Sequence, residues 1–366
     1  MKKILILANE EIGFYCFRIE LAERLMQEDY EVVLSAPKGM YRDTFEKMGI
    51  KRIITPLNRH GTNPLEDIVL FTRYLCMIIR EKPSVILTYT IKPNLYGSLA
   101  ARLCRVPCIA NVTGAGILFQ NKSLSRSMVS MLMHIAFKKN KCIFFQNRHN
   151  MELFQKNRLC GQKAILLPGS GVNLSKHRYQ EMPDSTDTVK FLMLGRVCED
   201  KGILEFLQAT KIMMDKYANC EFIIAGPSDD DVLQEKVNET ASKYPRLHVF
   251  GLLSADEASR LIASVHCLVN PSHHEGMSNV LQEAAATGRA VIASDIPGCQ
   301  EIVDDGVSGF LFQVTNTASL IKAMEKFINL SIDEKKRMGK AGRYKIEQVF
   351  DRDIVVNAYL NELLAL

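Results

Sequence analysis

Two carboxylates eight residues apart, Glu275 and Glu283, are the first candidates for binding chemistry in this chain. They flank the expected start of a helix over residues 277–287, where apolar side chains recur at helical spacing, and the apolar run 265–269 is typical of a buried strand. An ionised carboxylate only accepts hydrogen bonds and a sugar hydroxyl donates them, so the pair fits a hydroxyl-rich ligand. An ordinary amphipathic helix with Glu283 in solvent explains the spacing about as well.

The loop before that helix would add backbone donors. The first N–H groups of a helix lack partners within the helix and carry partial positive charge, which favours an anion or an oxygen-rich ligand. We therefore expect N–H groups of Gly276, Met277 and Ser278 to face the ligand that Glu275 contacts.

Two cations lie at another expected strand end. Residues 189–195 are expected to form a strand, so that Gly195 and Arg196 fall at its carboxyl end and Lys201 lies near the next helix start. An Arg fork and a Lys point charge can together hold a diphosphate, although both also occur on ordinary surface loops. Gly251, after a short expected strand, would let the backbone approach a nucleoside base.

No metal site is expected. Residues 229–231 are three consecutive aspartates, but turn carboxylates are common and we interpret these as a turn. The adjacent residues His273 and His274 do not easily face one ion, so we interpret them as loop residues, one of which could touch sugar or phosphate.

These pieces resemble a known family. P-S-x-x-E-G at 271–276, followed by E-A-x-A-x-G-x-x-V-I-A from Glu283, is similar to the E-x7-E region of family 4 retaining glycosyltransferases. L-G-R at 194–196 with K-G at 201–202 resembles the family's L-G-R-x-x-x-x-K-G, and the pieces follow the family's order. The resemblance implies the α/β GT-B fold, in which two Rossmann-like, doubly wound parallel-sheet domains face each other across a cleft.

The resemblance also implies roles for these residues. Arg196 and Lys201 would hold the diphosphate of a UDP-sugar, Glu275 would contact the sugar, and these three would form the catalytic set. Glu283 would bind the ribose hydroxyls. No metal or other cofactor is expected, because protein cations balance the leaving phosphates in this fold. The expected donor-binding residues are Gly13, Gly195, Gly251, Gly276, Met277, Ser278 and Glu283.

The first half of the chain alternates short apolar runs with expected helices, which predicts a parallel sheet. Ligands of such sheets bind at the carboxyl ends of strands. We expect an N-terminal acceptor domain over 1–182, a donor domain over 183–345, and a helix over 346–366 that crosses back to the first domain. The boundary is expected within the polar, turn-rich residues 174–188.

The first half is also basic. Residues 1–180 hold 27 Lys and Arg against 13 Asp and Glu, and residues 82–151 contain no acid. Such a surface attracts a phospholipid membrane, a lipid diphosphate or nucleic acid. We rank nucleic acid last because no recognisable binding motif accompanies the charge. The methionine-rich residues 118–137 would pack in the core or present an apolar face to lipid.

Five residues of this half are expected to contact an acceptor. The loop 88–97 resembles the I-K-P-N-x-Y-G stretch of bacterial transferases that build glycans on a polyprenyl carrier, which points to Lys92 and Asn94. Asn94 would alternatively cap a helix. Thr113 and Gly114 would lie beside the donor sugar and acceptor, and Arg18 would face substrate or cover its helix.

Composition places the chain among cytoplasmic proteins. No apolar run reaches the ~18 residues of a membrane span, and the N-terminal run has no cleavage site of a signal peptide. Ten cysteines without C-x-x-C pairs indicate reduced thiols. Because of its basic half, we expect the protein to be peripheral on the inner face of the cell membrane.

The sequence therefore predicts a retaining glycosyltransferase of surface glycan biosynthesis. It would move N-acetylhexosamine or galactose from a UDP-sugar to a sugar on a polyprenyl diphosphate. A UDP-sugar 2-epimerase of the same fold is the alternative enzyme, and a peripheral membrane or polyanion-binding module is the alternative without catalysis.

Overall fold

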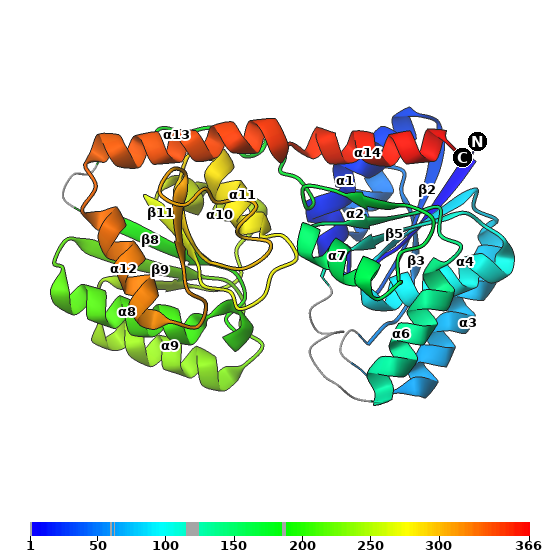
Figure 1. Ribbon diagram of the computed structural model, residues 1–366, viewed down its shortest axis with the longest axis horizontal. Helices are drawn as coiled ribbons and strands as arrows, with labels where there is room; N and C mark the ends of the chain where they lie inside the picture. The colour runs from blue at the N-terminus through cyan, green and yellow to red at the C-terminus, as the bar shows by residue number, and fades with distance from the viewer. Residues whose placement is uncertain (1, 59–60, 62, 115–123, 185–187) are drawn as a thin grey trace. The chain divides into compact units, whose positions relative to one another are not determined.

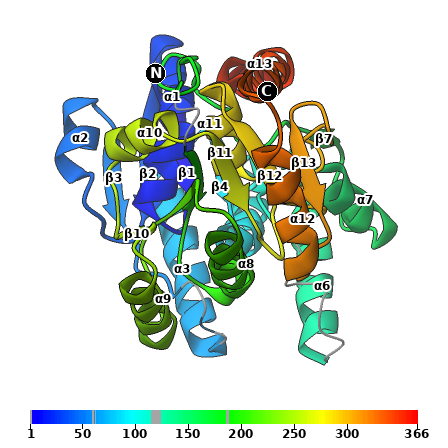
Figure 2. The same cartoon turned by 90° about the vertical axis from the view of Figure 1, so that its left-hand side faces the viewer.

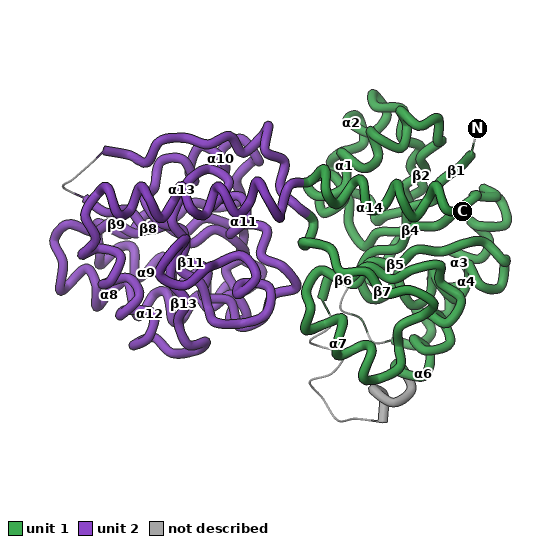
Figure 3. Tube along the Cα trace, turned by 45° about the horizontal axis from the view of Figure 1, so that its top comes forward, with its two compact units in different colours: residues 1–170, 352–366 green, residues 171–351 purple. Residues whose placement is uncertain are grey.

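The structure is a computed structural model that describes residues 2–58, 61, 63–114, 124–184 and 188–366. The chain forms two compact units, one of residues 1–170 with 352–366 and one of residues 171–351 (Figure 3). The first division therefore falls just before the predicted boundary region 174–188. The second division falls between residues 351 and 352, so that residues 352–366 belong to the N-terminal unit. The sequence predicts that a helix over 346–366 crosses back to this unit.

Unit 1 is built on a seven-stranded parallel sheet with the strand order β3-β2-β1-β4-β5-β6-β7. Short apolar segments buried on both faces form its central strands, as expected of parallel sheets. The strands are β1 (Lys2–Leu7), β2 (Tyr30–Ala36), β3 (Lys51–Ile54), β4 (Val85–Tyr89), β5 (Cys108–Val112), β6 (Cys142–Phe145) and β7 (Ala164–Leu166).

Helices cover both faces of this sheet (Figure 1). One face packs against α1 (Glu11–Gln27), α2 (Arg42–Lys47) and the C-terminal α14 (Arg352–Leu364). The other packs against α3 (Pro64–Glu81), a π-helical turn (Pro93–Gly97), α4 (Ser98–Cys104), α6 (Leu124–Phe137) and α7 (Arg148–Lys156). The C-terminal helix is thus part of the core of unit 1.

Unit 2 repeats the plan with a six-stranded parallel sheet in the order β10-β9-β8-β11-β12-β13. Figure 2 shows its two helical layers, with α8, α9 and α12 on one face and α10, α11 and α13 on the other. The strands are β8 (Val189–Leu194), β9 (Cys220–Ala225), β10 (Leu247–Phe250), β11 (Cys267–Asn270), β12 (Ala290–Ser294) and β13 (Gly309–Phe312). The helices are α8 (Ile203–Lys216), α9 (Asp231–Lys243), α10 (Ala255–Ala263), α11 (Asn279–Ala286), α12 (Thr317–Ile328) and α13 (Ile332–Val349).

The predicted α/β fold with two doubly wound parallel sheets is confirmed. The sequence predicts a helix over residues 17–27 with Gly13 in the loop before it, but α1 begins earlier, at Glu11, directly after an extended Glu10. Glu11 in the first turn complements the helix dipole. Gly13 therefore lies inside the first helical turn and does not form a loop before the helix. No helix among the described residues is both long and apolar enough to cross a membrane.

Candidate functional site

Lys201 and Glu275 meet at the carboxyl ends of the strands of unit 2. The Lys201 ammonium lies 2.6 Å from Glu275 Oε1, although 74 residues separate the two positions. Lys201 ends a single 3₁₀ turn (Glu199–Lys201) after β8, and Glu275 belongs to the loop between β11 and α11. The structure thus brings together one predicted cation and one predicted acid, both partly buried.

Buried polar side chains contact Oε1 of Glu275, the carboxylate oxygen that also faces Lys201. The Ser272 hydroxyl lies 2.8 Å from Glu275 Oε1 and 2.6 Å from Asn270 Oδ1. The Asn270 amide donates to Ser278 Oγ at 2.7 Å and lies 3.4 Å from Glu275 Oε1. Asn270, Ser272 and Ser278 are all buried, so this polar network fixes the carboxylate in a position set by the fold.

Close backbone packing brings the Lys201 turn onto the loop of Glu275. Gly202 has a φ of 71°, and a Cβ atom there would lie 2.1 Å from the carbonyl oxygen of Pro271. Only glycine fits this contact. Two further bonds join the segments, since the His273 N–H donates to the Asp200 carbonyl at 2.8 Å and the His273 ring lies 3.0 Å from Glu205. The ring of His273 therefore has a protein partner.

The other predicted cation, Arg196, follows β8 and is exposed. Its guanidinium lies 3.6 Å from the carboxylate of Asp229 in the loop after β9. Gly195 has a φ of 153°, with open space where a Cβ would stand. Asp230 caps α9 by accepting from the N–H groups of Val232 and Leu233. Arg196 is therefore at the expected strand end, but its contact is with Asp229 and not with Lys201 or Glu275.

Among the described residues, no group of three or more His, Cys, Asp or Glu side chains could hold a metal ion. The Cys299 thiol lies 3.9 Å from the Asn270 amide. Burial raises the pKa of Cys299 well above its usual value, and the nearby Glu275 charge raises it further, so the thiol stays neutral beside this network.

The predicted backbone donors before α11 are only partly open to a ligand. The Ser278 N–H donates to the Gly298 carbonyl at 3.0 Å, and the Met277 side chain is buried in the core of unit 2. Ser278 thus serves the fold, and the prediction that its N–H binds a ligand lacks support. Gly276 and Glu283 are half-buried, and Glu283 is the fifth residue of α11.

Gly251 lies directly after β10, as predicted. A Cβ atom added at Gly251 would meet nothing within 4 Å, so backbone approach by a ligand is sterically possible there. Its carbonyl accepts from the Gly226 N–H at 3.1 Å, which fixes the turn.

Two predicted site residues of unit 1, Arg18 and Gly13, are packed against other parts of the protein. The Arg18 side chain is buried, with its guanidinium 4.9 Å from the centre of the Tyr89 ring and donating to the Phe17 carbonyl. Gly13 in α1 has little space beside it, since a Cβ would lie 3.1 Å from the Glu10 carboxylate. These contacts favour the covering role for Arg18 and leave the proposed ligand role of Gly13 without support.

Asn94 joins two strands of unit 1. Its side chain is buried, accepts from the Thr88 hydroxyl at 2.7 Å and donates to the Asn111 carbonyl at 2.8 Å. It is not a helix cap, because the π-helical turn begins at Pro93 and Lys92 is its N-cap residue. The prediction of a capping role is wrong, and an acceptor contact finds no support because both ends of the amide are already bonded.

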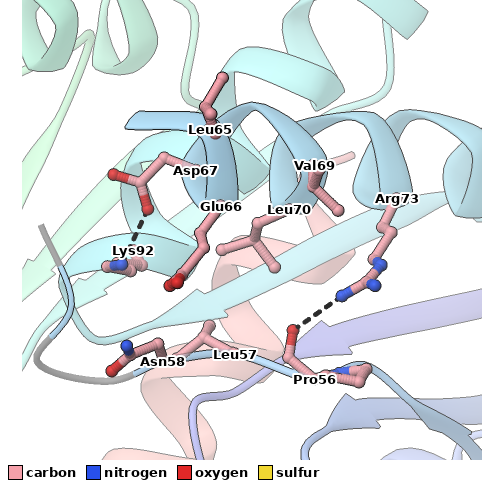
Figure 4. A pocket seen from close by; sticks show the side chains of 10 residues that line it. All are labelled: Pro56, Leu57, Asn58, Leu65, Glu66, Asp67, Val69, Leu70, Arg73 and Lys92. Carbon is pink, nitrogen blue, oxygen red and sulfur yellow. Dashed lines mark hydrogen bonds and ion pairs between the residues drawn. The ribbon is translucent and has the colours of Figure 1, made fainter. Parts of the chain in front are cut away.

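Lys92, in contrast, lines a pocket at the carboxyl ends of β3 and β4 (Figure 4). The pocket has a volume of about 510 Å³. The Lys92 ammonium lies 2.7 Å from Asp67. The lining combines apolar and charged side chains, which suits an amphiphilic ligand: Pro56, Leu57, Asn58, Leu65, Glu66, Asp67, Val69, Leu70, Arg73 and Lys92.

Thr113 and Gly114 directly follow β5 and are half-buried, with open space where a Cβ of Gly114 would stand. The first part of the predicted methionine-rich helix, residues 118–123, lies outside the described residues. Its remainder forms α6. In that helix Met133 is buried in the core, as one of the two predictions has it, and Met131 is exposed, while contact with lipid stays a prediction.

Sequence reasoning missed Asn270, Ser272 and Gly298 as parts of the site. The signal for Ser272 was available, because it belongs to the P-S-x-x-E-G motif and lies three residues before Glu275. Gly298 has a φ of 88°, and a Cβ there would lie 2.9 Å from the Gly276 carbonyl. That contact joins segments distant in the chain, so it has no local sequence signal.

Family profiles match both units. One described as "Glycosyl transferase 4-like" matches residues 3–147, and one described as "Glycosyl transferases group 1" matches residues 188–329. The chain belongs to the GT-B glycosyltransferases. The Lys201–Glu275 pair of this glycosyltransferase lies within the second match.

Relatives cover nearly the whole glycosyltransferase. It is 26% identical to the N,N'-diacetylbacillosaminyl-diphospho-undecaprenol alpha-1,3-N-acetylgalactosaminyltransferase of Campylobacter jejuni, over 98% of this chain and 97% of the relative. It is 23% identical to the UDP-Gal:alpha-D-GlcNAc-diphosphoundecaprenol alpha-1,3-galactosyltransferase of Escherichia coli, over 90% and 87%. The crystal structure of Anabaena Alr3699/HepE with UDP and glucose has the same fold, with a TM-score of 0.80 at 16% identity over 100% of both chains.

Proposed function

We propose that this glycosyltransferase moves a sugar from a UDP-sugar to a sugar carried on a polyprenyl diphosphate, with retention of configuration. The Lys201–Glu275 pair at the strand ends of unit 2 carries the proposal. The names of the Campylobacter and E. coli relatives, which describe transfer to undecaprenol diphosphate-linked sugars, support the acceptor class. The transferred sugar would be an N-acetylhexosamine or galactose.

In the donor site, charged side chains would bind the UDP-sugar. Lys201 and Arg196 would hold the diphosphate and stabilise the charge that develops on the departing UDP, where preorganised cations act most strongly. The buried network through Oε1 orients the Glu275 carboxylate, which would accept hydrogen bonds from donor sugar hydroxyls. Glu283 would bind the ribose. The leaving phosphate would take the acceptor proton as the acceptor attacks from the same face.

Protein cations would take the place of a metal ion in this scheme. A Lys and an Arg at strand ends supply the positive charge that a divalent cation supplies elsewhere, so we propose that no cofactor is needed. The co-substrate would be the UDP-sugar alone.

The acceptor half would belong to unit 1. The pocket at the ends of β3 and β4 offers Lys92 and Arg73 for phosphate and Asp67 and Glu66 for sugar hydroxyls, above an apolar wall. Its substrate would reside in a membrane, so we propose that the enzyme works as a peripheral protein on the inner face of the cell membrane.

The double variant Arg196→Ala with Lys201→Ala tests the donor assignment. Removing one preorganised donor typically costs about 10²–10³ in turnover, so we expect the double variant to lose at least a thousandfold. Lys216→Ala, which removes an exposed Lys paired with Glu325, is the matched control and should keep wild-type turnover. Turnover of the double variant within tenfold of wild type would remove the diphosphate assignment.

A further inference from the structure

The outward side of α3 is apolar where solvent would favour polar residues. Its core side is buried through Leu70, Tyr74 and Ile78. Leu65, Ile68, Val69 and Ile79 are exposed, with exposed fractions from 47% to 71%. At 100° per residue these four fall on the side of the helix opposite the buried one. A soluble helix normally places charged or polar residues there.

The helices α4 and α6 of the same layer also expose apolar side chains. In α6, Met131 and Ile135 are exposed while Met133 and Phe137 are buried, and α4 contributes the exposed Leu103. The helices α3, α4 and α6 cover one face of the sheet of unit 1 (Figure 1), so their outward sides point away from the same layer. We call the exposed set the outer face: Leu65, Ile68, Val69, Ile79, Leu103, Met131 and Ile135.

Cations flank the outer face. Arg73 and Arg80 are exposed on α3 beside its apolar residues, and Lys138 and Lys139 are exposed at the end of α6. Residues 82–151, which include α4 and α6, contain no Asp or Glu. Glu81 is buried and paired with lysines. Glu66 is an exposed acid beside Leu65, and the four cations outnumber it. Seven apolar side chains with this excess of positive charge match a bilayer whose headgroups carry negative charge.

We propose that the outer face docks on an anionic lipid bilayer, which specifies the membrane contact that the proposed function requires. The apolar side chains would enter the boundary between headgroups and acyl chains, and the cations would pair with lipid phosphates. A second copy of this chain is a poorer occupant, because pairing two outer faces would bring Arg73, Arg80, Lys138 and Lys139 against one another.

The acceptor pocket adjoins this surface. Leu65 and Val69 belong to the outer face and also line the pocket (Figure 4). A bilayer in contact with α3 would therefore bring lipid phosphates to the level of Arg73 and Lys92. The proposal rests on the proposed function in this respect, since a lipid-borne acceptor needs such an approach.

Vesicle flotation tests the docking face. The full chain would be mixed with phosphatidylcholine vesicles with and without about one-third phosphatidylglycerol, and its bound fraction measured. We expect the triple variant Ile68→Ser, Ile79→Ser, Met131→Ser to bind anionic vesicles at least tenfold more weakly. The double variant Arg73→Gln with Arg80→Gln should bind anionic vesicles about fivefold more weakly for each cation removed, and its binding should depend less on salt concentration. The matched control is Val232→Ser with Ile212→Ser, two exposed apolar residues of unit 2.

Two further readouts separate the explanations. Melting temperature and UDP affinity should be unchanged in the triple variant, because its residues are exposed and belong to unit 1, whereas the donor site belongs to unit 2. Wild-type binding by the triple variant, or wild-type protein that ignores anionic vesicles, would overturn the proposal. A wild-type dimer in sedimentation that becomes monomeric in the triple variant would overturn it in favour of a second copy.

Turnover on a water-soluble short-chain acceptor diphosphate serves as the separate test of the proposed function. The triple variant should keep full turnover on this acceptor if its defect lies only in membrane docking. Absence of transfer by wild type under these conditions counts against the proposed function and leaves the vesicle result to decide the docking face.

Discussion

At the scale of residues, the site depends on how Glu275 is held. Lys201, Ser272 and Asn270 all approach Oε1 of its carboxylate. Hydrogen bonds to an ionised group are among the stronger ones in proteins, at about 1.5–3 kcal/mol. Because all three contacts converge on Oε1, they orient the carboxylate and leave its second oxygen, Oε2, to accept from a ligand.

Ser272→Ala tests this orientation. Loss of the hydroxyl should let the carboxylate rotate and weaken binding of the UDP-sugar by about tenfold, which corresponds to about 1.4 kcal/mol. Binding of UDP alone should stay within twofold, because Glu275 is assigned to the sugar. Calorimetric titration with UDP-N-acetylgalactosamine, UDP-galactose and UDP measures both.

The control for this prediction is Ser242→Ala, which removes a hydroxyl that bonds a carbonyl at the end of α9. Equal loss of UDP and UDP-sugar affinity in Ser272→Ala would indicate a general defect of the fold. Unchanged affinity for every ligand would contradict the assignment of Glu275 to the sugar.

Motif residues could be assigned from the sequence, but their partners could not. The family motif predicted Lys201 and Glu275, and the structure brings them within 2.6 Å. The environment of Asn94 was not predictable, because its bond to the Asn111 carbonyl depends on the pairing of β4 with β5. The sequence around Asn94 would look the same whether its side chain faced solvent in a loop or linked two strands in the core.

At the scale of elements, Glu81 fastens α3 to the sheet. The last residue of this helix accepts from Lys51 of β3 at 2.6 Å and from Lys3 of β1 at 3.1 Å. The hydrogen bond from Lys51 is the main cause that holds the pKa of Glu81 below its ordinary value of 4.5, and burial opposes it. Because the folded pKa is lowered, the stabilisation is present above pH 4.5 and is lost as pH falls through the folded pKa.

Glu81→Gln should therefore lower the melting temperature near neutral pH, with a loss of about 1–3 kcal/mol of stability from the weakened buried contacts. The difference from wild type should shrink below pH 4.5, where wild-type Glu81 also becomes neutral. Calorimetric scans at several pH values measure this, with the exposed Glu235→Gln as control. A difference that stays constant down to pH 3 would contradict the pairing.

Elements with strong local signals were predicted well. The sequence predicts a helix over residues 64–81, and α3 has these bounds, with Pro64 at its first position. The apolar runs of the parallel strands are likewise recognisable from local chemistry. The sequence analysis predicts no strand after residues 290–293, so β13 was missed; the segment has only four residues, and it begins with Gly309, which weakens the signal for a strand. It forms because β12 pairs with it along four positions.

At the scale of the whole molecule, the chain is two parallel-sheet units whose matches to glycosyltransferase profiles lie one in each. Unit 2 contains the Lys201–Glu275 pair, and unit 1 contains the amphiphilic pocket and the outer face. This division of charge and apolar surface is what a transfer from a soluble nucleotide sugar to a lipid-borne acceptor requires.

Acceptor-dependent release of UDP tests that account most directly. Purified protein would be incubated with each UDP-sugar, with and without a short-chain polyprenyl diphosphate carrying a sugar, in buffer containing EDTA. We predict that UDP appears with one donor, only when the acceptor is present and without added metal, and that Arg196→Ala with Lys201→Ala abolishes it. UDP release that is independent of acceptor, or its absence with every donor and acceptor tried, would contradict the central claim.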